Sequence, residues 1–187
     1  MILIEYWPSL AVISGIWVLA RALLWIKEKR ISIKRELQLL LVYVCIAVVW
    51  RFTFFPFGKV DGEIQPLVID IANMFNFKIN VVPFVNLMDY PERKDVVINV
   101  VGNTTMFIPL GIIWPMVYKK LNTHAKVILA GVGVSLTIEF LQLFVYERFT
   151  DIDDLILNSA GFAAGYGIYL LAKKFKQRAD KKRHAEK

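Results

Sequence analysis

The sequence predicts an all-α protein, a single membrane domain over residues 1–187 built as a bundle of about five transmembrane helices. First, 57% of the 187 residues are hydrophobic and the mean hydropathy is +0.50, whereas soluble domains are about 45–50% apolar. Second, the apolar residues gather in runs of about 20 residues, the length that a helix needs to cross a bilayer. Third, the basic residues lie at alternate ends of these runs, as the positive-inside rule requires.

The first two spans are expected at residues 7–26 and 37–57. No small-residue cleavage site follows the first run, which we therefore interpret as a retained helix rather than a signal peptide. Arg21 lies near its inner end, where the aliphatic stem lets the guanidinium reach the lipid headgroups. The connection to the second span is strongly basic and is assigned to the cytoplasm; its cations are Lys27, Lys29, Arg30, Lys34 and Arg35.

The other three spans are expected at residues 96–118, 125–149 and 152–172. A basic tail of residues 173–187 follows the last span, and this tail is also assigned to the cytoplasm. Because the number of spans is odd, the N-terminus is then extracytoplasmic. The connection between the third and fourth spans agrees with this orientation through Lys119, Lys120 and Lys126.

The long loop of residues 58–95 has the opposite charge. It carries four basic and six acidic residues, a net charge of −2, and the turn that contains Glu147, Arg148, Asp151 and Asp153 is also net acidic. Both segments are therefore assigned to the extracytoplasmic side. Apolar residues of the loop recur at helical spacing and predict a short helix on the outer membrane surface: Leu67, Val68, Ile71, Ala72 and Phe75.

The composition excludes several other classes of protein. The formal net charge of +7 comes from cations at the ends of apolar runs, so it reflects membrane topology rather than binding of nucleic acid. The one cysteine, Cys45, leaves no disulfide to form, and His124 and His184 both lie beside basic clusters, which argues against a zinc site. We predict no nucleic-acid partner, no metal and no cofactor.

Several polar side chains fall at membrane depth, where a charge costs about 2.5–3.5 kcal/mol on insertion scales and needs a reason. The helical rise of about 1.5 Å per residue places each of them along its span. Four spans put polar residues into the outer half of the bilayer: Arg51 in the second, Asn99 and Asn103 in the third, Glu139 and Gln142 in the fourth, and Asp154 and Asn158 in the fifth.

Helical spacing places these residues on shared faces. Glu139 and Gln142 are three residues apart, and Asp154 and Asn158 are four apart, so each pair points to one side of its helix. Small residues continue the second face and predict a close approach by another helix: Gly161 and Gly165.

Two interpretations of the buried polar residues stay open. In the first, they lock the helices together, and Arg51 is neutralised by Glu139 or Asp154, because a buried charge needs a partner. In the second, they line an outward-facing polar pocket. Two arginines, Arg51 and Arg148, together with several carboxylates exceed what one locking pair needs, and this favours the pocket.

The same residues carry a resemblance to a known family. Over residues 51–165, and in matching order, the chain resembles the VanZ-like membrane protein family. The resemblance implies a bacterial cell-envelope protein and, since the founding member of the family is associated with low-level teicoplanin resistance, an effect on glycopeptide susceptibility, but no particular reaction. It rests on Arg51 and Pro56, NVVPF at 80–84, NVVGN at 99–103, FIPLG at 107–111, EFLQ at 139–142, and Arg148, Asp151, Asp154, Asn158 and Gly161.

Three functions follow as hypotheses. The first is a non-catalytic envelope protein whose polar pocket binds an amphiphile: a membrane lipid, a lipid-linked wall precursor or a lipoglycopeptide. Arginines would hold phosphate or carboxylate groups, and amides would supply hydrogen bonds. The predicted ligand-binding residues are Arg51, Asn99, Asn103, Glu139, Gln142, Arg148, Asp151, Asp154 and Asn158.

The second hypothesis is an intramembrane enzyme acting on a lipid headgroup or a lipid-linked phosphate, with Glu139 or Asp154 as general base. A divalent cation on Asp151, Asp153 and Asp154 is an alternative to a helix start capped by Asp151 or Asp153. The third is a transporter, which the absence of a visible repeat and the confinement of polar groups to one leaflet disfavour. The oligomeric state is left open.

Overall fold

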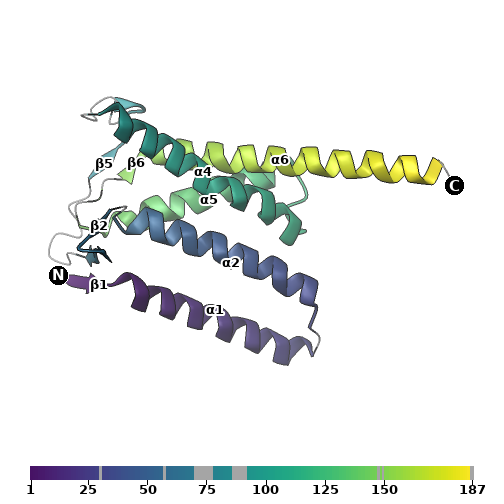
Figure 1. The fold of residues 1–187 in the computed structure, drawn as a ribbon, viewed down its shortest axis with the longest axis horizontal. Helices are drawn as coiled ribbons and strands as arrows, with labels where there is room; N and C mark the ends of the chain where they lie inside the picture. The colour runs from purple at the N-terminus through teal and green to yellow at the C-terminus, as the bar shows by residue number, and fades with distance from the viewer. Residues whose placement is uncertain are drawn as a thin grey trace.

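Five long helices dominate the computed structural model, which describes residues 1–29, 31–56, 58–69, 78–85, 92–146, 148 and 150–185. Each is long and apolar enough to cross a membrane, which confirms the predicted all-α bundle of five spans. The helices run alternately between two ends, so the N- and C-termini lie at opposite ends (Figure 1). They are α1 (Tyr6–Glu28), α2 (Ile33–Phe54), α4 (Arg93–Val117), α5 (His124–Gln142) and α6 (Ile152–Ala185).

Two helix boundaries differ clearly from the prediction. The fourth span was expected to reach residue 149, but α5 ends at Gln142. The residues after it form turns, and their backbone bonds to the loop instead, since the N–H of Tyr146 donates to the carbonyl oxygen of Val68 at 2.8 Å. At the other end, α6 continues through the basic tail to Ala185, so the tail is helical within the described residues.

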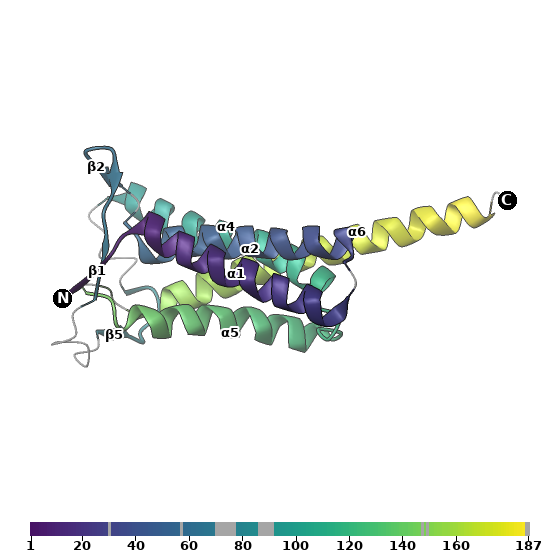
Figure 2. The same ribbon diagram turned by 90° about the horizontal axis from the view of Figure 1, so that it is seen from below.

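Three short two-stranded sheets lie at the end of the bundle that holds the N-terminus (Figure 2). One joins β1 (Ile2–Ile4) antiparallel to β4 (Leu67–Ile69), and Leu3 pairs with Val68. Leu67 and Val68, predicted to begin a surface helix, therefore lie in a strand, and the rest of that predicted helix falls outside the described residues. The other sheets are the antiparallel hairpin of β2 (Lys59–Val60) and β3 (Glu63–Ile64) and the parallel pair of β5 (Ile79–Asn80) and β6 (Thr150–Asp151).

The two helices α4 and α6 are in backbone contact through glycines. A Cβ atom added at Gly161 would lie 2.0 Å from the carbonyl oxygen of Thr104, and one at Gly165 would lie 2.1 Å from that of Ile108. Only a residue without a side chain allows this approach. The structure therefore confirms the predicted close approach of another helix along the glycine face, and this contact fixes Asp154 and Asn158 of α6 beside α4.

Helix α1 is peripheral: none of its residues is buried. Polar contacts hold it to α2. Arg21 was predicted to extend to the lipid headgroups, but it forms a bidentate ion pair with Glu36. Its Nη2 lies 2.5 Å from Oε1 and its Nε lies 2.9 Å from Oε2. The hydroxyls of Ser14 and Tyr43 share a hydrogen bond of 2.5 Å. The apolar face of α1 is left to the lipid.

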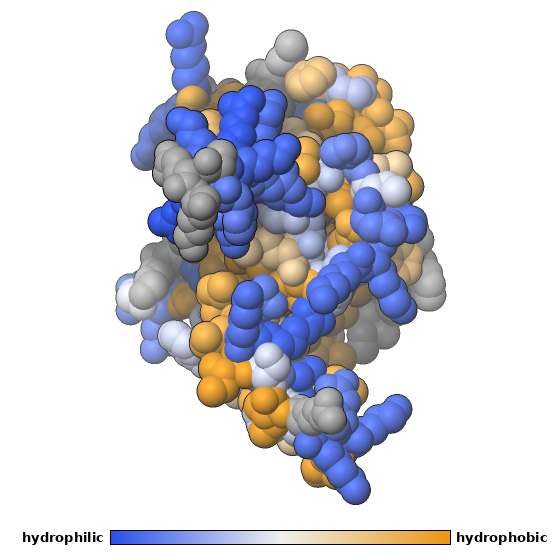
Figure 3. All heavy atoms as spheres, turned by 90° about the vertical axis from the view of Figure 1, so that its right-hand side faces the viewer, coloured by the Kyte–Doolittle hydropathy of each residue, from blue (hydrophilic) through white to orange (hydrophobic). Residues whose placement is uncertain are grey.

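The two ends of the bundle differ in charge. Hydrophilic side chains gather over the end from which the tail of α6 projects (Figure 3). The described cations in and beside the α1–α2 and α4–α5 connections lie at this end, and five of them are exposed: Lys27, Lys29, Lys34, Lys119 and Lys120.

Candidate functional site

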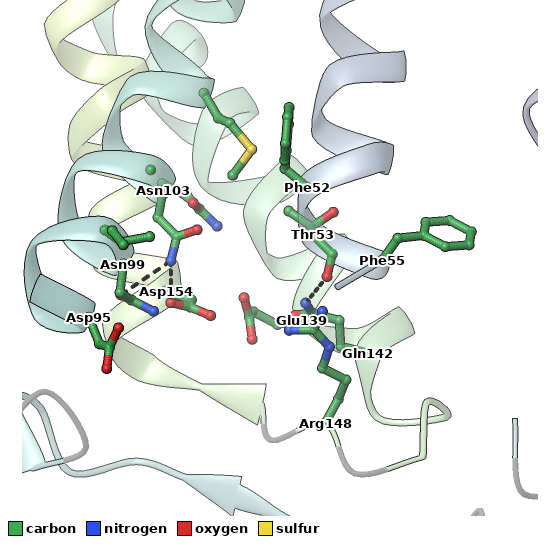
Figure 4. A pocket seen from close by; sticks show the side chains of 14 residues that line it. Phe52, Thr53, Phe55, Asp95, Asn99, Asn103, Glu139, Gln142, Arg148 and Asp154 are labelled. Carbon is green, nitrogen blue, oxygen red and sulfur yellow. Dashed lines mark hydrogen bonds between the residues drawn. The ribbon is translucent and has the colours of Figure 1, made fainter. Parts of the chain in front are cut away.

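A polar cavity of about 290 Å³ lies among α2, α4, α5 and α6, near the end that carries the strands (Figure 4). Three carboxylates, one arginine and several amides line it, although the surrounding helices are apolar. The full lining is Phe52, Thr53, Phe55, Asp95, Ile98, Asn99, Gly102, Asn103, Met106, Glu139, Gln142, Arg148, Asp154 and Asn158.

The structure brings seven of the nine predicted ligand-binding residues to this one cavity. They come from α4, α5, α6 and the α5–α6 connection, as the depth argument expects. Their role in binding stays a prediction. The seven residues are Asn99, Asn103, Glu139, Gln142, Arg148, Asp154 and Asn158.

Arg51 does not line the cavity, so its predicted place there is wrong. Its Nη1 donates to the carbonyl oxygen of Pro56 at 2.9 Å and to that of Phe55 at 3.4 Å, and its guanidinium lies 5.6 Å from the ring centre of Tyr6. The carbonyl groups at the end of α2 lack helical donors, and a nearby arginine supplies them. The expected neutralisation of Arg51 by Glu139 or Asp154 is therefore replaced by a helix cap.

Asp151, the other predicted residue outside the lining, organises the start of α6. Its Oδ1 accepts from the backbone N–H of Asp153 at 3.0 Å, as an N-cap does, and from the side-chain amide of Asn80 at 3.1 Å. Its own N–H donates to Oε2 of Glu139 at 3.2 Å. Asp151 thus holds a wall of the cavity in position rather than facing into it.

The three neighbouring carboxylates at this helix start point to different partners. Oδ1 of Asp153 accepts from the backbone N–H of Phe84 at 2.7 Å, whereas Oδ1 of Asp154 accepts from the side-chain amide of Asn103 at 2.5 Å. Among the described residues, no three His, Cys, Asp or Glu side chains are placed to hold a metal ion. The capped helix start accounts for this cluster, and the alternative of a divalent cation has no support.

Three of the lining residues, which we call the cavity wall, each present a buried oxygen atom that has no hydrogen-bond partner. These atoms are Oε1 of Glu139, Oε1 of Gln142 and Oδ1 of Asn158, and these side chains are only 4%, 4% and 1% exposed. The nitrogen of each amide is already engaged: that of Gln142 donates to the carbonyl oxygen of Thr53 at 2.8 Å, and that of Asn158 to the hydroxyl of Ser135 at 3.1 Å. Leaving a buried polar atom without a partner lowers the stability of the fold by about 1–3 kcal/mol. A ligand that donates hydrogen bonds to these oxygens would recover this loss.

Charges are unevenly distributed around the cavity. Asp95 and Asp154 lie on one side, Arg148 on the other, and the carboxylate of Glu139 between them (Figure 4). Arg148 interacts electrostatically with both Glu139 and Asp154. With three carboxylates and one guanidinium, the ionised lining has a net charge of −2. The site is acidic, whereas the sequence had suggested a pair of arginines.

Some of the lining residues were not predicted from the sequence. Asp95 was assigned to the loop, yet it lies four residues before Asn99 and so on the same face of α4; helical spacing was the signal that pointed to it. Gly102 lies on that face as well. Thr53 gave no signal, because it contributes the backbone carbonyl oxygen that fixes Gln142.

Five apolar spans, four of which surround a polar cavity, define a multi-pass membrane protein. Residues 40–173 match the family described as VanZ/LLP1, and the chain belongs to this family, which confirms the resemblance found in the sequence. It is similar to Protein VanZ of Enterococcus faecium, with 26% identity over 135 residues that cover 72% of this chain and 74% of that protein. No solved structure matches the chain.

Proposed function

We propose that this protein is a cell-envelope membrane protein that binds an amphiphilic envelope ligand in the polar cavity, with its N-terminus outside and its C-terminus in the cytoplasm. The observation that carries the proposal is the wall of three buried acceptor oxygens in Glu139, Gln142 and Asn158, which have no partner in the protein. A network that served only to lock helices would supply each of these oxygens with a hydrogen-bond donor from the protein itself.

The charge distribution supports the orientation. The exposed lysines in and beside the α1–α2 and α4–α5 connections lie at the end opposite the strands, and cations next to transmembrane helices favour the cytoplasmic side. The cavity then belongs to the outer leaflet, where lipid-linked wall precursors and lipoglycopeptides are found together with ordinary lipids.

The surroundings of the cavity favour an amphiphile. A volume of about 290 Å³ suits a headgroup rather than a whole lipid. Ile98 lines the cavity, and on the same helix Ile98, Val97 and Val101 are all exposed. A ligand whose polar part enters the cavity can therefore lay its apolar part along α4 among the lipid chains.

A second candidate function is catalysis on such a ligand, and the geometry of one residue favours it. Glu139 has one oxygen held by the N–H of Asp151 and the other without a partner, which is how a positioned general base is presented. Asp154 already accepts from Asn103, so Glu139 is the better candidate. Arg148 is placed to stabilise negative charge that develops nearby.

The test compares the full-length protein with Glu139→Gln, after extraction into nanodiscs with native lipid, by mass spectrometry of the retained molecules. Glu63→Gln is the matched control, because Glu63 is exposed in the hairpin at the same end. We expect Glu139→Gln to lose a ligand that the wild type and the control keep. In a deletion strain, only the wild type and the control should restore teicoplanin susceptibility to its original level, since the family resemblance points to this phenotype.

Identical retained molecules in all three proteins would overturn the proposal. The catalytic alternative predicts, in addition, a chemically altered product that accumulates with time in the wild type and not in Glu139→Gln. A ligand that is retained unchanged favours binding alone.

A further inference from the structure

The chemistry of the cavity wall specifies what kind of group it receives. All three unpartnered atoms, in Glu139, Gln142 and Asn158, are oxygens, and an oxygen of a carboxylate or an amide accepts hydrogen bonds. The assignment is firm for Gln142, because its amide nitrogen donates to the carbonyl oxygen of Thr53, which only accepts. The missing partner is therefore a group that donates several hydrogen bonds from N–H or O–H.

The charge of the lining adds a second requirement. Asp95, Glu139 and Asp154 outnumber Arg148 by three to one, so the ionised lining carries more negative charge than Arg148 alone can compensate. A cationic ligand group next to the carboxylates reduces this imbalance, and an anionic one there increases it. The same ligand group must therefore donate several hydrogen bonds and carry a positive charge.

We propose that the cavity binds the primary ammonium group of a zwitterionic headgroup, with Arg148 facing the headgroup's phosphate or carboxylate. This inference rests on the proposed function and names the ligand class for the same site. A primary ammonium combines three N–H donors with a positive charge, and the lining that would receive it holds the unpartnered oxygens of Glu139, Gln142 and Asn158. The anionic half can face Arg148, which lies on the other side of the Glu139 carboxylate from Asp95 and Asp154 (Figure 4).

Other cations fit the wall less well. A quaternary ammonium has no N–H group, so all three oxygens would stay unpaired, and its usual site is an aromatic cage. A guanidinium prefers both oxygens of a carboxylate, but one oxygen of Glu139 is taken by the N–H of Asp151. A metal ion is disfavoured because the described residues offer no cluster of three suitable side chains.

The experiment measures binding of short-chain phospholipids with identical tails to the full-length protein in detergent, by native mass spectrometry. The probes are phosphatidylethanolamine, its mono- and dimethylated forms, phosphatidylcholine and phosphatidylglycerol. We expect affinity to fall at each added methyl group and to be about tenfold or more weaker for phosphatidylcholine and for phosphatidylglycerol, since each lost charged hydrogen bond is worth about a factor of ten. O-phosphoethanolamine as a competitor separates recognition of a free amine from recognition of a lipid.

The variant Glu139→Gln should selectively lower the affinity for phosphatidylethanolamine, to the level of the affinity for phosphatidylcholine. The control Glu63→Gln should leave both affinities unchanged. The methylation series on the wild type answers the question even where a variant fails to fold. Equal or tighter binding of phosphatidylglycerol that still depends on Glu139 would overturn the ammonium assignment and leave the proposed binding function standing. Affinity that changes neither with methylation of the amine nor with Glu139→Gln would overturn both the ammonium assignment and the proposed binding function.

Discussion

The backbone N–H of Asp151 donates a hydrogen bond of 3.2 Å to Oε2 of Glu139, so the start of α6 holds one oxygen of this carboxylate and leaves the other to the cavity. The hydroxyl of Thr150 donates to the backbone carbonyl oxygen of the same glutamate at 3.0 Å. The connection between α5 and α6 therefore fixes both the side chain and the backbone of Glu139. This arrangement presents a buried carboxylate in a defined direction, as a binding or catalytic site requires.

Substitutions that remove a carboxylate charge but keep the shape of the side chain distinguish a binding site from a network that only locks helices. In Glu139→Gln and Asp154→Asn, an amide oxygen can still accept the bonds from Asp151 and Asn103. We expect near-normal membrane abundance for at least one variant, with a stability change of about 1 kcal/mol or less, because binding sites often carry repulsion that such a change relieves. That variant should nevertheless fail to retain the ligand and fail to restore the teicoplanin susceptibility of a deletion strain to its original level. Failure of both variants to accumulate would favour a locking network instead.

Arg51 and Glu139 should behave independently. Arg51→Ala removes the donors to the carbonyl oxygens of Phe55 and Pro56 and should lower the free energy of unfolding by about 1 kcal/mol. Because Arg51 does not line the cavity, the double variant with Glu139→Gln should show the sum of the two single effects. Thermal melting of the four proteins in detergent measures this, and a coupling energy well above about 0.5 kcal/mol would mean that the two side chains interact.

The contrast between Arg51 and Asp154 shows which features of the site can be predicted from the sequence. Depth in the membrane follows from position in an apolar run, because the helical rise is constant, and so the gathering of polar groups at one level was predictable. The rotation of each helix about its own axis is set by packing against its neighbours. Hydropathy contains little of that information, and Arg51 was therefore placed at the right depth but in the wrong direction.

The strands were missed for a different reason. The pairing of Ile2–Ile4 with Leu67–Ile69 joins segments that are far apart in the chain, so neither segment carries a local signal for it. A short apolar run is compatible with a helix or a strand, and its spacing alone does not decide between them. The early end of α5 has the same origin, since the residues after Gln142 bond to strand β4.

The contact between α4 and α6 should tolerate no side chain at Gly161. In Gly161→Ala the new Cβ would lie 2.0 Å from the carbonyl oxygen of Thr104, and such overpacking costs about 1–3 kcal/mol or more. Gly167→Ala is the control on the same helix, because a Cβ there meets no atom within 4 Å. We expect reduced abundance and a lower melting temperature for the first variant alone. Equal behaviour of the two variants would argue against the close approach of these helices.

The ion pair between Arg21 and Glu36 should hold α1 to the bundle. The two side chains are 14% and 18% exposed, and removing one member of a buried pair costs about 3–5 kcal/mol, with a smaller loss expected for a partly exposed pair. Arg21→Leu and Glu36→Leu should each lower the melting temperature, while the double variant should recover most of the loss because no charge is left unpaired. A double variant as unstable as the worse single variant would mean that the charges act separately.

The orientation in the membrane is open to a direct chemical test. Glu63→Cys places a thiol in the exposed hairpin at the end that carries the strands, and Lys120→Cys places one in the exposed α4–α5 connection at the other end. The native Cys45 is buried, at 8% exposure, so the wild type should give a low background with a membrane-impermeant maleimide. By the positive-inside rule, we expect Glu63→Cys to be labelled in intact cells and Lys120→Cys only after permeabilisation. The reverse pattern would move the cavity to the cytoplasmic leaflet, and lipid-linked precursors on the outer surface would no longer be able to reach it.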